Sequence, residues 1–520
     1  MDYHTVVTTL TTSAASLFRF DSSYARDLEG LYVPWKAAEF PQPKLIKLNH
    51  ALAEELGLDA AALESDEGAL IFSGQHLPEG VKTIAQAYAG HQFGGFSPQL
   101  GDGRALLLGE VIDKQGKRRD IAFKGSGRTP FSRGGDGKAA LGPVLREYII
   151  GEAMHALGVP TTRALAAVTT GEFVRRERNL PGAVLTRVAA SHIRVGSFQF
   201  AAARGDVDLL RRLADYTIAR HYPELSGGEG RYWGLLEGLV ERQAGLIAHW
   251  MSIGFIHGVM NTDNMTLSGE TIDYGPCAYM DGYDPATVFS SIDEYGRYAY
   301  ANQPPIAVWN LSRFAEALLP FLVDSRDSDQ RKAQDAAVAR ATGILEGFQA
   351  CYAARWTQRM RAKLGLTTED AQDAVLAADF LQALQEQEGK PGADFTQAFR
   401  TLADVAEGAL APADYLRRMS GANRAALTDW LPRWQSRTSV EAQTPAERAA
   451  AMRAVNPVYI PRNHKVEEAL DAAVALGDYR PFEQLLAVLV QPFDERPGFE
   501  SYAAPAAADF AAGYQTFCGT

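Results

Sequence analysis

The chain has 520 residues, of which 46% are hydrophobic and 22% are charged, a composition typical of a globular protein with two or three lobes. Its 51 basic and 63 acidic residues give a net charge of −12, which argues against nucleic acid or an anionic membrane as a partner. No stretch approaches the roughly 18 apolar residues of a membrane span. Three cysteines are too few for a disulfide framework, so we expect a soluble, unsecreted protein of a reducing compartment.

The first part of the chain has the signals of a small β-rich lobe. Residues 29–57 pass from a Pro-punctuated extended segment into a short helix and are predicted to form an arm rather than a domain. Two apolar runs around a polar turn predict a hairpin over 104–124. Helical spacing follows over 141–158, and residues 182–196 return to strand character. The sequence therefore predicts a strand-strand-helix-strand lobe.

Two features of this lobe are compatible with phosphate binding. Gly101 and Gly103 precede the first hairpin strand, where bare N–H groups can approach a phosphate that Arg104 would neutralise, although such a turn is more often only a turn. Lys124 ends the second strand, in the position of the nucleotide lysine of kinases. Its acidic partner would be Glu147 or Glu152 on the next helix, and the helical wheel leaves both open.

Between that lysine and the helix lies an insert that kinases lack, GSGRTPFSRGGDGKAALG. Its glycines, a helix N-terminus and the side chains of Arg128, Arg133 and Lys138 can grip a polyphosphate. Arg187 and Arg194 add two positive charges in an apolar context, for which the alternative is salt bridging at strand ends.

After about residue 205 the sequence is mostly helical, with a strong amphipathic helix over 232–255. Residues 256–275, IHGVMNTDNMTLSGETIDYG, follow it and have the outline of a kinase catalytic loop running into a metal-binding turn. His257 and Asn264 keep the kinase spacing and Asp273 heads the turn. Val259, however, stands where a kinase has its catalytic aspartate.

A valine cannot accept a proton, so the loop belongs either to a dead kinase or to a site in which another group, such as Asp263, serves a different reaction. Asn264 and Asp273 carry oxygen ligands of the kind that Mg²⁺ accepts. His257 is interpreted as a buried scaffold residue.

A β-rich front and a helical body around this motif predict an α+β, bilobal, protein-kinase-like fold. The expected divisions are 1–100 for an N-terminal arm and the start of the first lobe, 101–205 for the nucleotide-binding first lobe, and 206–520 for the helical second lobe with its catalytic loop and cysteine-bearing tail.

Long segments of the chain closely resemble the selenoprotein O family, also called SelO or YdiU, and the likeness covers nearly the whole sequence. The segments are QAYAGHQFGGFSPQLGDGRALLLGEV, KGSGRTPFSRGGDGKAALGPVLREYIIGEAMHALGVPTTRAL, GAVLTRVAASHIRVGSFQ, GFIHGVMNTDNMTLSGETIDYGPCAYMDGYDP and NPVYIPRNH. The resemblance implies a kinase-like fold that holds ATP flipped, with the α-phosphate facing the acceptor. The implied activity is transfer of AMP from ATP to Ser, Thr or Tyr hydroxyls of proteins, itself included, in the bacterial cytoplasm.

The resemblance also implies roles for individual residues. It implies an ion pair of Lys124 with Glu147, Mg²⁺ or Mn²⁺ on Asn264 and Asp273, and Asp263 as the base. The implied nucleotide contacts are Gly101, Gly103, Arg104, Lys124, Asp136, Gly137, Arg187, Arg194 and Asp273.

In selenium-containing members the selenocysteine lies third from the C-terminus, where this chain has Cys518. A reversible disulfide of Cys518 with Cys277 is expected to adjust activity to redox state. Two other readings of the whole chain stay open at this stage. They are a kinase-like phosphotransferase, which would transfer the γ-phosphate, and a nucleotide-binding scaffold without turnover.

Overall fold

The computed structural model describes residues 18–324 and 326–517. The chain groups into two compact units. The first, here the sheet unit, comprises the chain up to Gln86 with Asp102–Leu141 and Ala164–Ala190. The second, the helical unit, comprises Ala87–Gly101, Gly142–Arg163 and the chain from Ser191 onward. The expected divisions at residues 100 and 205 stay a prediction; the chain passes between the two units several times.

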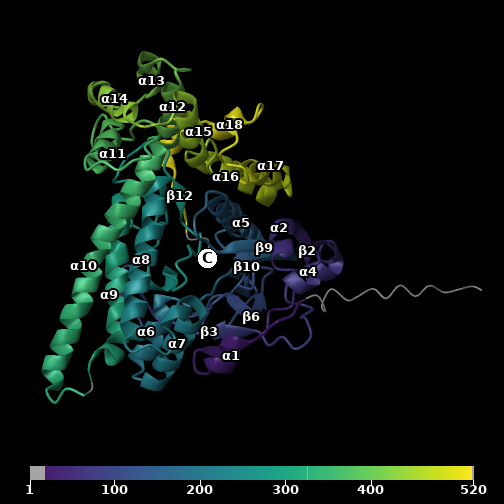
Figure 1. Cartoon of the computed structure of the whole chain (residues 1–520). Coiled ribbons are helices and arrows are strands. Elements are labelled where there is room, and N and C mark those ends of the chain that lie inside the picture. Colours follow the sequence, from purple (N-terminus) through teal and green to yellow (C-terminus); the bar gives the residue numbers. More distant parts are fainter. Residues whose placement is uncertain (1–17, 325, 518–520) are drawn as a thin grey trace, which may run out of the picture. The chain divides into compact units, whose positions relative to one another are not determined.

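The sheet unit is built on an eight-stranded sheet with the main order β1-β3-β6-β7-β10-β9-β2, and β8 pairs with β10 (Figure 1). The predicted hairpin is confirmed, because β6 and β7 pair antiparallel. The strand bounds are β1 Tyr32–Pro34, β2 Lys44–Leu48, β3 Ile84–Gln86, β6 Ala105–Ile112, β7 Arg118–Lys124, β8 Ala139–Ala140, β9 Arg163–Arg175 and β10 Asn179–Ala189.

The hydrophobic core of the sheet unit lies on one face of this sheet. Ile121 and Phe123 of β7 and Val184 and Val188 of β10 belong to one buried cluster, together with side chains of the short helices. Since side chains alternate along a strand, the residues between them point to the opposite face. The helices of this unit are α1 Ser23–Asp27, α2 His50–Glu55, α3 Ala60–Leu63 and α4 Asp66–Phe72.

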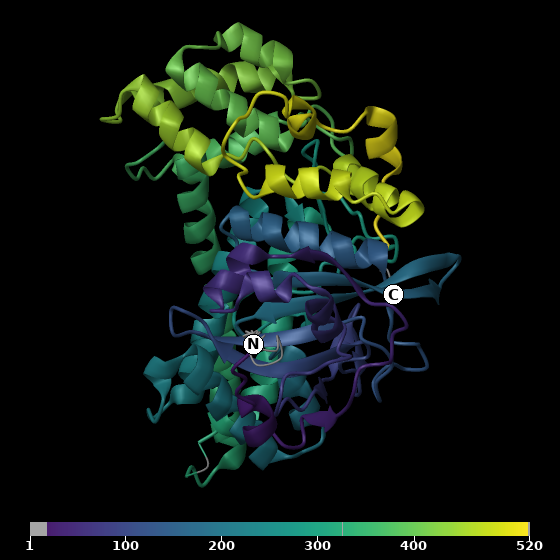
Figure 2. The same cartoon turned by 90° about the vertical axis from the view of Figure 1, so that its right-hand side faces the viewer.

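The expectation of an arm over 29–57 was wrong. This segment supplies both edge strands, since β1 and β2 lie at opposite ends of the strand order (Figure 2). Residues 35–43, here called the strap, connect them; at about 4.8 Å per strand they must cover about 30 Å and so run largely extended. Backbone bonds from Trp35 N to Thr83 O (3.0 Å) and from Ala38 N to Ser126 O (2.8 Å) hold the strap. Strand partners this distant in sequence leave no local signal.

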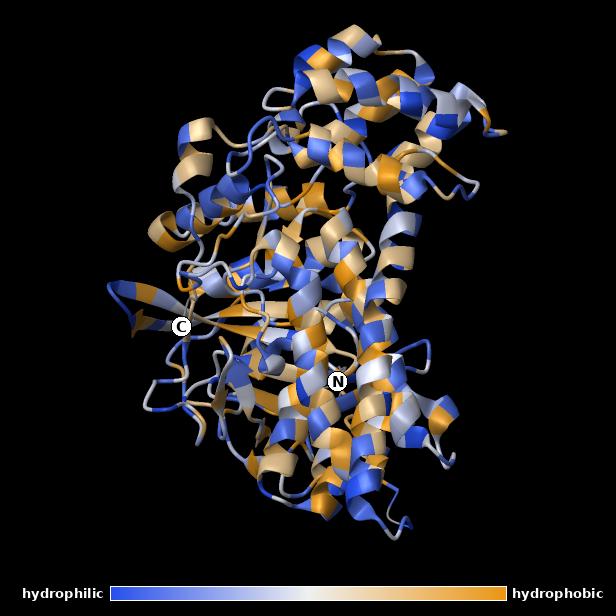
Figure 3. Cartoon of the chain, turned by 90° about the vertical axis from the view of Figure 1, so that its left-hand side faces the viewer, coloured by the Kyte–Doolittle hydropathy of each residue, from blue (hydrophilic) through white to orange (hydrophobic). Residues whose placement is uncertain are grey.

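The helical unit contains the longest helices of the described chain. Figure 3 shows hydrophobic and hydrophilic residues alternating in short stretches along them. The predicted helix over 232–255 is confirmed as α8 Arg231–Ser252, which packs against α9 and α10. None of the described helices is long and apolar enough to cross a membrane.

The remaining elements of this unit include short strand pairs near the predicted catalytic loop. The strands are β4 Gly90–Gln92 with β5 Gly95–Ser97, and β11 Phe255–Ile256 with β12 Ala278–Tyr279. The helices are α5 Leu141–Ala156 (its first residue groups with the sheet unit), α6 Val195–Ala203, α7 Val207–His221, α9 Gln303–Leu322, α10 Gln330–Lys363, α11 Asp373–Ala383, α12 Phe395–Glu407, α13 Pro412–Arg418, α14 Arg424–Ser439, α15 Pro445–Val455, α16 Asn463–Asp471, α17 Arg480–Leu489, α18 Glu500–Ala503 and α19 Ala508–Gly513.

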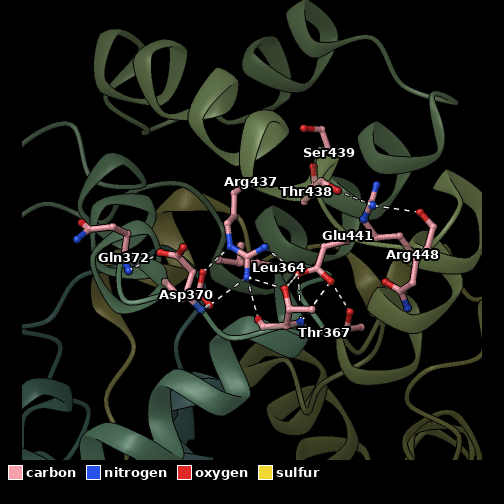
Figure 4. A network of polar contacts seen from close by, with 12 residues as sticks. Leu364, Thr367, Asp370, Gln372, Arg437, Thr438, Ser439, Glu441 and Arg448 are labelled. Carbon is pink, nitrogen blue, oxygen red and sulfur yellow. Dashed lines mark hydrogen bonds and ion pairs between the residues drawn. The ribbon is translucent and has the colours of Figure 1, made fainter.

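A polar network joins α11 and α14 to the loop between α10 and α11 in this unit (Figure 4). The Arg437 guanidinium donates to the carboxylates of Asp373 (2.8 Å) and Glu441 (2.7 Å). Glu441 also accepts from the hydroxyls of Thr367 and Thr368 and from the Thr368 N–H. An antiparallel sheet in one unit and helices in the other confirm the predicted α+β class.

Candidate functional site

The loop after α8 is organised around His257. This side chain is 1% exposed; its Nε2–H donates to the Ile272 carbonyl (2.9 Å), and its Nδ1 accepts from the Val259 N–H (3.3 Å). Burial lowers the pKa of His257, so the ring is neutral. Both nitrogens are used by the backbone, which confirms the interpretation of His257 as a scaffold residue. It fixes the start of the loop against the residue before Asp273.

Asp263 is a buried carboxylate with few donors. It lies in the 3-10 turn Thr262–Asn264 and is 8% exposed. Its Oδ1 has no hydrogen-bond partner in the described part of the chain, and its Oδ2 accepts only a long bond from Gln92 Nε2 (3.5 Å). Burial raises the pKa of Asp263 to about 6, with Arg194 opposing the shift and Asp273 adding to it. A carboxyl of this pKa can act as a base near neutral pH.

Asp273 and Arg194 form an ion pair beside this carboxylate. Arg194 Nη1 donates to Asp273 Oδ2 (3.0 Å) and to the main-chain oxygen of Asp263 (3.0 Å). Arg194 is 3% exposed, so its charge is fixed in place. Asp273 has a φ of 63°, a left-handed conformation that is costly for a residue other than glycine. One guanidinium thus joins the two segments that carry the candidate aspartates.

Asn264 and Asp273 are suited to a hard metal ion. Asn264 Nδ2 donates to the Val259 carbonyl (2.9 Å), which fixes the orientation of the amide. An amide oxygen and a carboxylate oxygen match the preference of Mg²⁺, which takes phosphate oxygens and water for its other positions. Among the residues with described positions, no group of three or more His, Cys, Asp or Glu side chains is placed to hold a metal. Asn264 and Asp273 offer such an ion one amide oxygen and one carboxylate oxygen.

In the sheet unit, Lys124 and Arg187 lie on the same face of the sheet. Lys124 is opposite Leu185 and Arg187 is opposite Ala122, so the two side chains are diagonal neighbours on adjacent strands. This face is opposite to the hydrophobic cluster, and Arg187 is 3% exposed. Arg104 precedes Ala105, which is the partner of Lys124 on β6. Three predicted cationic residues therefore gather at one end of three neighbouring strands.

The glycine-rich insert is a closed loop that contacts the Gly-Asp-Gly turn. Gly127 N donates to Gly137 O (3.0 Å), and Thr129 Oγ1 donates to Asp102 O (2.6 Å). A side chain at Gly103 would place its Cβ 2.9 Å from the Phe131 carbonyl oxygen, so this close approach needs glycine. Within the sheet unit, the structure brings the two segments that were predicted for phosphate binding together.

Asp136 and Gly101 are two further residues for which a nucleotide contact is predicted. The Asp136 carboxylate is paired with Arg176 (2.9 Å). Gly101 belongs to the helical unit and has a φ of 130°.

The two glutamates of α5 differ in their partners. Glu152 accepts two hydrogen bonds from Arg163, to its Oε1 (2.8 Å) and its Oε2 (2.7 Å). Glu147 is 5% exposed and lies close enough to Tyr274 that, after burial, its charge helps to raise the pKa of that phenol. Because Glu152 already has a partner, Glu147 is the better candidate for Lys124, and this pairing stays a prediction.

Sequence reasoning missed Arg146 and Gln92. Arg146 donates to the carbonyls of Gly275 and Cys277 (both 3.3 Å) and to the Tyr514 hydroxyl (2.8 Å), which ties α5 to the turn after Asp273 and to the C-terminal segment. Both residues lie in segments that carry the family resemblance, but nothing in their spacing singled either residue out. The order of residues along α5, with Arg146 next to Glu147, was the only available signal.

The predicted disulfide involves Cys518, which lies outside the described residues. Cys277 is buried, and Thr516 Oγ1 donates to the Pro276 carbonyl (2.7 Å). The segment before Cys518 therefore lies beside Cys277, and the disulfide itself stays a prediction.

Residues 16–490 match the family model described as Protein adenylyltransferase SelO. The chain is 62% identical over 506 residues to the protein nucleotidyltransferase YdiU of Cereibacter sphaeroides (strain ATCC 17023), a match that covers 97% of this chain and 100% of that protein. It is 59% identical to the protein of the same name from Chromobacterium violaceum, over 94% of this chain and 99% of the relative. For the Rhizobium etli protein the identity is 57%, over 97% of each chain.

Proposed function

Because the chain belongs to the protein adenylyltransferase SelO family, an enzyme family, we propose that it transfers AMP from ATP to Ser, Thr or Tyr hydroxyls of proteins, itself included. The observation that carries the proposal is the arrangement of Asp263, Arg194 and Asp273. A carboxylate with a raised pKa lies beside a carboxylate that is neutralised by a buried guanidinium. Val259 leaves the usual kinase base position without a carboxylate, and Asp263 supplies one four residues later.

In the proposed reaction Asp263 accepts the proton of the acceptor hydroxyl. The hydroxyl oxygen forms a bond to the α-phosphorus of ATP, and the bond from that phosphorus to the bridging oxygen of the β-phosphate breaks. Pyrophosphate leaves with the electron pair, and Asp263 later returns its proton to solvent. A pKa of about 6 supports this role, since the group is mostly ionised at neutral pH and still basic enough to take a proton.

Asn264 and Asp273 are proposed to hold Mg²⁺ or Mn²⁺, which when bound would neutralise charge on the phosphates. Arg194 restricts the orientation of the Asp273 carboxylate through its hydrogen bond and compensates part of its charge.

The nucleotide contacts are proposed as the family resemblance implies them. They are Lys124, with Glu147 as its ionic partner, and Gly101, Gly103, Arg104, Asp136, Gly137, Arg187, Arg194 and Asp273. The position of Lys124 and Arg187 on one face of the sheet, with Arg104 just before the strand residue that pairs with Lys124, supports this assignment.

Redox control is proposed for Cys277 and Cys518. The hydrogen bond from Thr516 to the Pro276 carbonyl supports it, because it holds the C-terminal segment beside the turn that follows Asp273. A reducing cytoplasm, the proposed location, would make such a bond transient.

Parallel incubation with α-labelled and γ-labelled ATP tests the proposal. Label on protein from α-labelled ATP alone is the expected result. Label from γ-labelled ATP alone would instead identify a phosphotransferase. Nucleotide-dependent thermal stabilisation without any transferred label would identify a scaffold, the alternative that Val259 favours.

A further inference from the structure

The hairpin β4–β5 of the helical unit has an unusual turn. Phe93 and Gly94 connect the strands with φ values of 51° and 88°. Positive φ at both positions defines a type I′ turn, which prefers Asn-Gly, and a bulky residue at the first position is strained. The Phe93 ring is nevertheless 38% exposed and lies edge-on to Tyr298, with 5.2 Å between ring centroids. The hairpin therefore tolerates strain while presenting an aromatic side chain, a combination that occurs at functional sites.

This hairpin is fastened to the loop that carries Asp263. His91 N donates to Thr262 Oγ1 (2.7 Å), and Phe93 N donates to Asn261 Oδ1 (3.0 Å). Gly90 lies so close to Asp263 that a Cβ there would be 2.8 Å from its Oδ1. The candidate base thus lies beside β4, and a strand added to the other edge, that of β5, would lie about 10 Å from β4, a distance that the side chain of an acceptor residue can span.

One edge of the hairpin is occupied and the other is open. The outward N–H of β4, that of His91, is used by Thr262. On β5 the pairs Gly90–Ser97 and Gln92–Gly95 bond to each other, so the N–H and carbonyl of Phe96 point away from β4. Phe96 is 44% exposed, and its main chain has no hydrogen bond to another residue of the described ranges. An open strand edge is a template for an added extended segment.

The surroundings of the hairpin are aromatic and positively charged. The Arg297 guanidinium lies 4.8 Å from the Trp309 ring and 3.8 Å from where a Cβ of Gly94 would be. Among the described side chains, no carboxylate lies within 4.0 Å of Arg297. His91 contacts both Phe96 (4.9 Å between ring centroids) and Trp309 (5.2 Å). This local positive charge contrasts with the net charge of −12 of the chain.

We propose that the hairpin Gly90–Ser97 is the acceptor-protein site: an extended, hydroxyl-bearing segment with acidic side chains adds to the open edge of β5, between the Phe93 and Phe96 rings and the Arg297 guanidinium. This inference rests on the proposed function. It assigns to the hairpin the selection of the acceptor and leaves nucleotide binding to other residues.

The turn is tested by Phe93→Asn, with Phe173→Asn at a 71% exposed phenylalanine as the matched control. Asparagine tolerates positive φ, so the hairpin should keep its fold while losing the ring. With a glutamate–tyrosine copolymer as acceptor, we expect KM for the copolymer to rise about tenfold in Phe93→Asn, with kcat and ATP binding nearly unchanged. Phe93→Tyr should restore KM. An unchanged KM in Phe93→Asn would overturn the assignment.

The open edge is tested by comparing Phe96→Pro with Phe96→Ala. Both remove the ring, but only proline removes the outward N–H, and an outward edge position accepts proline without loss of a hairpin bond. Phe96→Pro should weaken acceptor use several-fold more than Phe96→Ala, at equal thermal stability. Equal acceptor KM values in the two variants would exclude strand addition.

Charge selection is tested with a lysine–tyrosine copolymer. Wild-type protein should prefer the glutamate copolymer, and Arg297→Gln should reduce that preference. Self-labelling from α-labelled ATP without labelling of the glutamate copolymer would refute the acceptor site and leave the proposed function standing. Absence of any label from α-labelled ATP would refute the proposed function.

Discussion

Two polar clusters of the helical unit are each built around a carboxylate, but the pKa of the carboxylate is lowered in one cluster and raised in the other. In the network of Figure 4, burial favours a raised pKa for Glu441, yet hydrogen bonds from Thr367, Thr368 and Arg437 lower it to about 2. At the candidate site the carboxylate of Asp263 has one oxygen without a partner in the described chain, and burial raises its pKa to about 6. The number of donors distinguishes a carboxylate that stabilises the fold from one that is available for chemistry.

The largest expected effect is that of Asp273→Ala, which should abolish AMP transfer. The change removes a charged metal-binding group and leaves the buried Arg194 guanidinium without the carboxylate that it contacts at 3.0 Å. Transfer of label from α-labelled ATP measures the effect, and Asp324→Ala at an exposed aspartate of the same unit is the control. Transfer by Asp273→Ala at the level of the control would contradict the assignment.

Asp263→Asn should lower the transfer rate by about 10²–10⁴-fold and leave ATP binding intact, because it removes a base and keeps the shape of the side chain. The pH profile sharpens this prediction. The active form is the ionised carboxylate, so the wild-type rate should fall as pH drops below about 6 and level off above it. If the transfer rate of Asp263→Asn fell at the same pH as that of the wild type, another group would be responsible for the titration.

Glu441→Gln should lower the free energy of unfolding by about 2 kcal/mol without a loss of activity per folded molecule, because it removes the buried charge that accepts hydrogen bonds from Arg437, Thr367 and Thr368, while Arg437 keeps its ion pair with Asp373. The folded-state pKa of Glu441 is depressed, so its contribution is complete above the unfolded-state value of 4.5 and is lost as pH falls towards about 2. Denaturant unfolding of both proteins between pH 7 and pH 2 measures this. If the difference in unfolding free energy between the two proteins did not shrink as the pH is lowered, this prediction would be contradicted.

The smallest effect is expected for Thr368→Val, which removes one hydroxyl donor (2.7 Å) to Glu441 and keeps the side-chain shape. Stability should fall by about 1 kcal/mol. NMR titration should give a higher pKa for Glu441 in the variant than in the wild type. Glu441 would then resemble Asp263, a carboxylate with few hydrogen-bond donors and a raised pKa. An unchanged pKa would show that Arg437 and Thr367 suffice.

The sequence predicted those features that depend on local spacing. The hairpin β6–β7, the helix α8 and the buried role of His257 follow from periodicity and a short motif, and the structure contains them. The contact of Gln92 with Asp263 joins positions 171 residues apart, and that of Thr367 with Glu441 joins positions 74 residues apart, so neither leaves a local pattern.

The choice between Glu147 and Glu152 was open in the helical wheel because both side chains are buried. The hydrogen bond from Arg163 to Glu152 in the structure favours Glu147 as the predicted partner of Lys124. Residues 29–57 were mistaken for an arm because the partners of their strands, β1 and β2, lie elsewhere in the chain.

The pairing of β2 with β9 also constrains how the protein is made. β2 is one of the first strands to leave the ribosome, but its sheet partner is β9, more than a hundred residues later. Until β9 and β10 have been synthesised, the nascent chain exposes an unpaired strand and most of an apolar core, a state prone to association. Vectorial folding from the N-terminus is therefore blocked in the sheet unit. Chaperone dependence during translation, and poor expression of truncations that end before residue 190, follow from this topology.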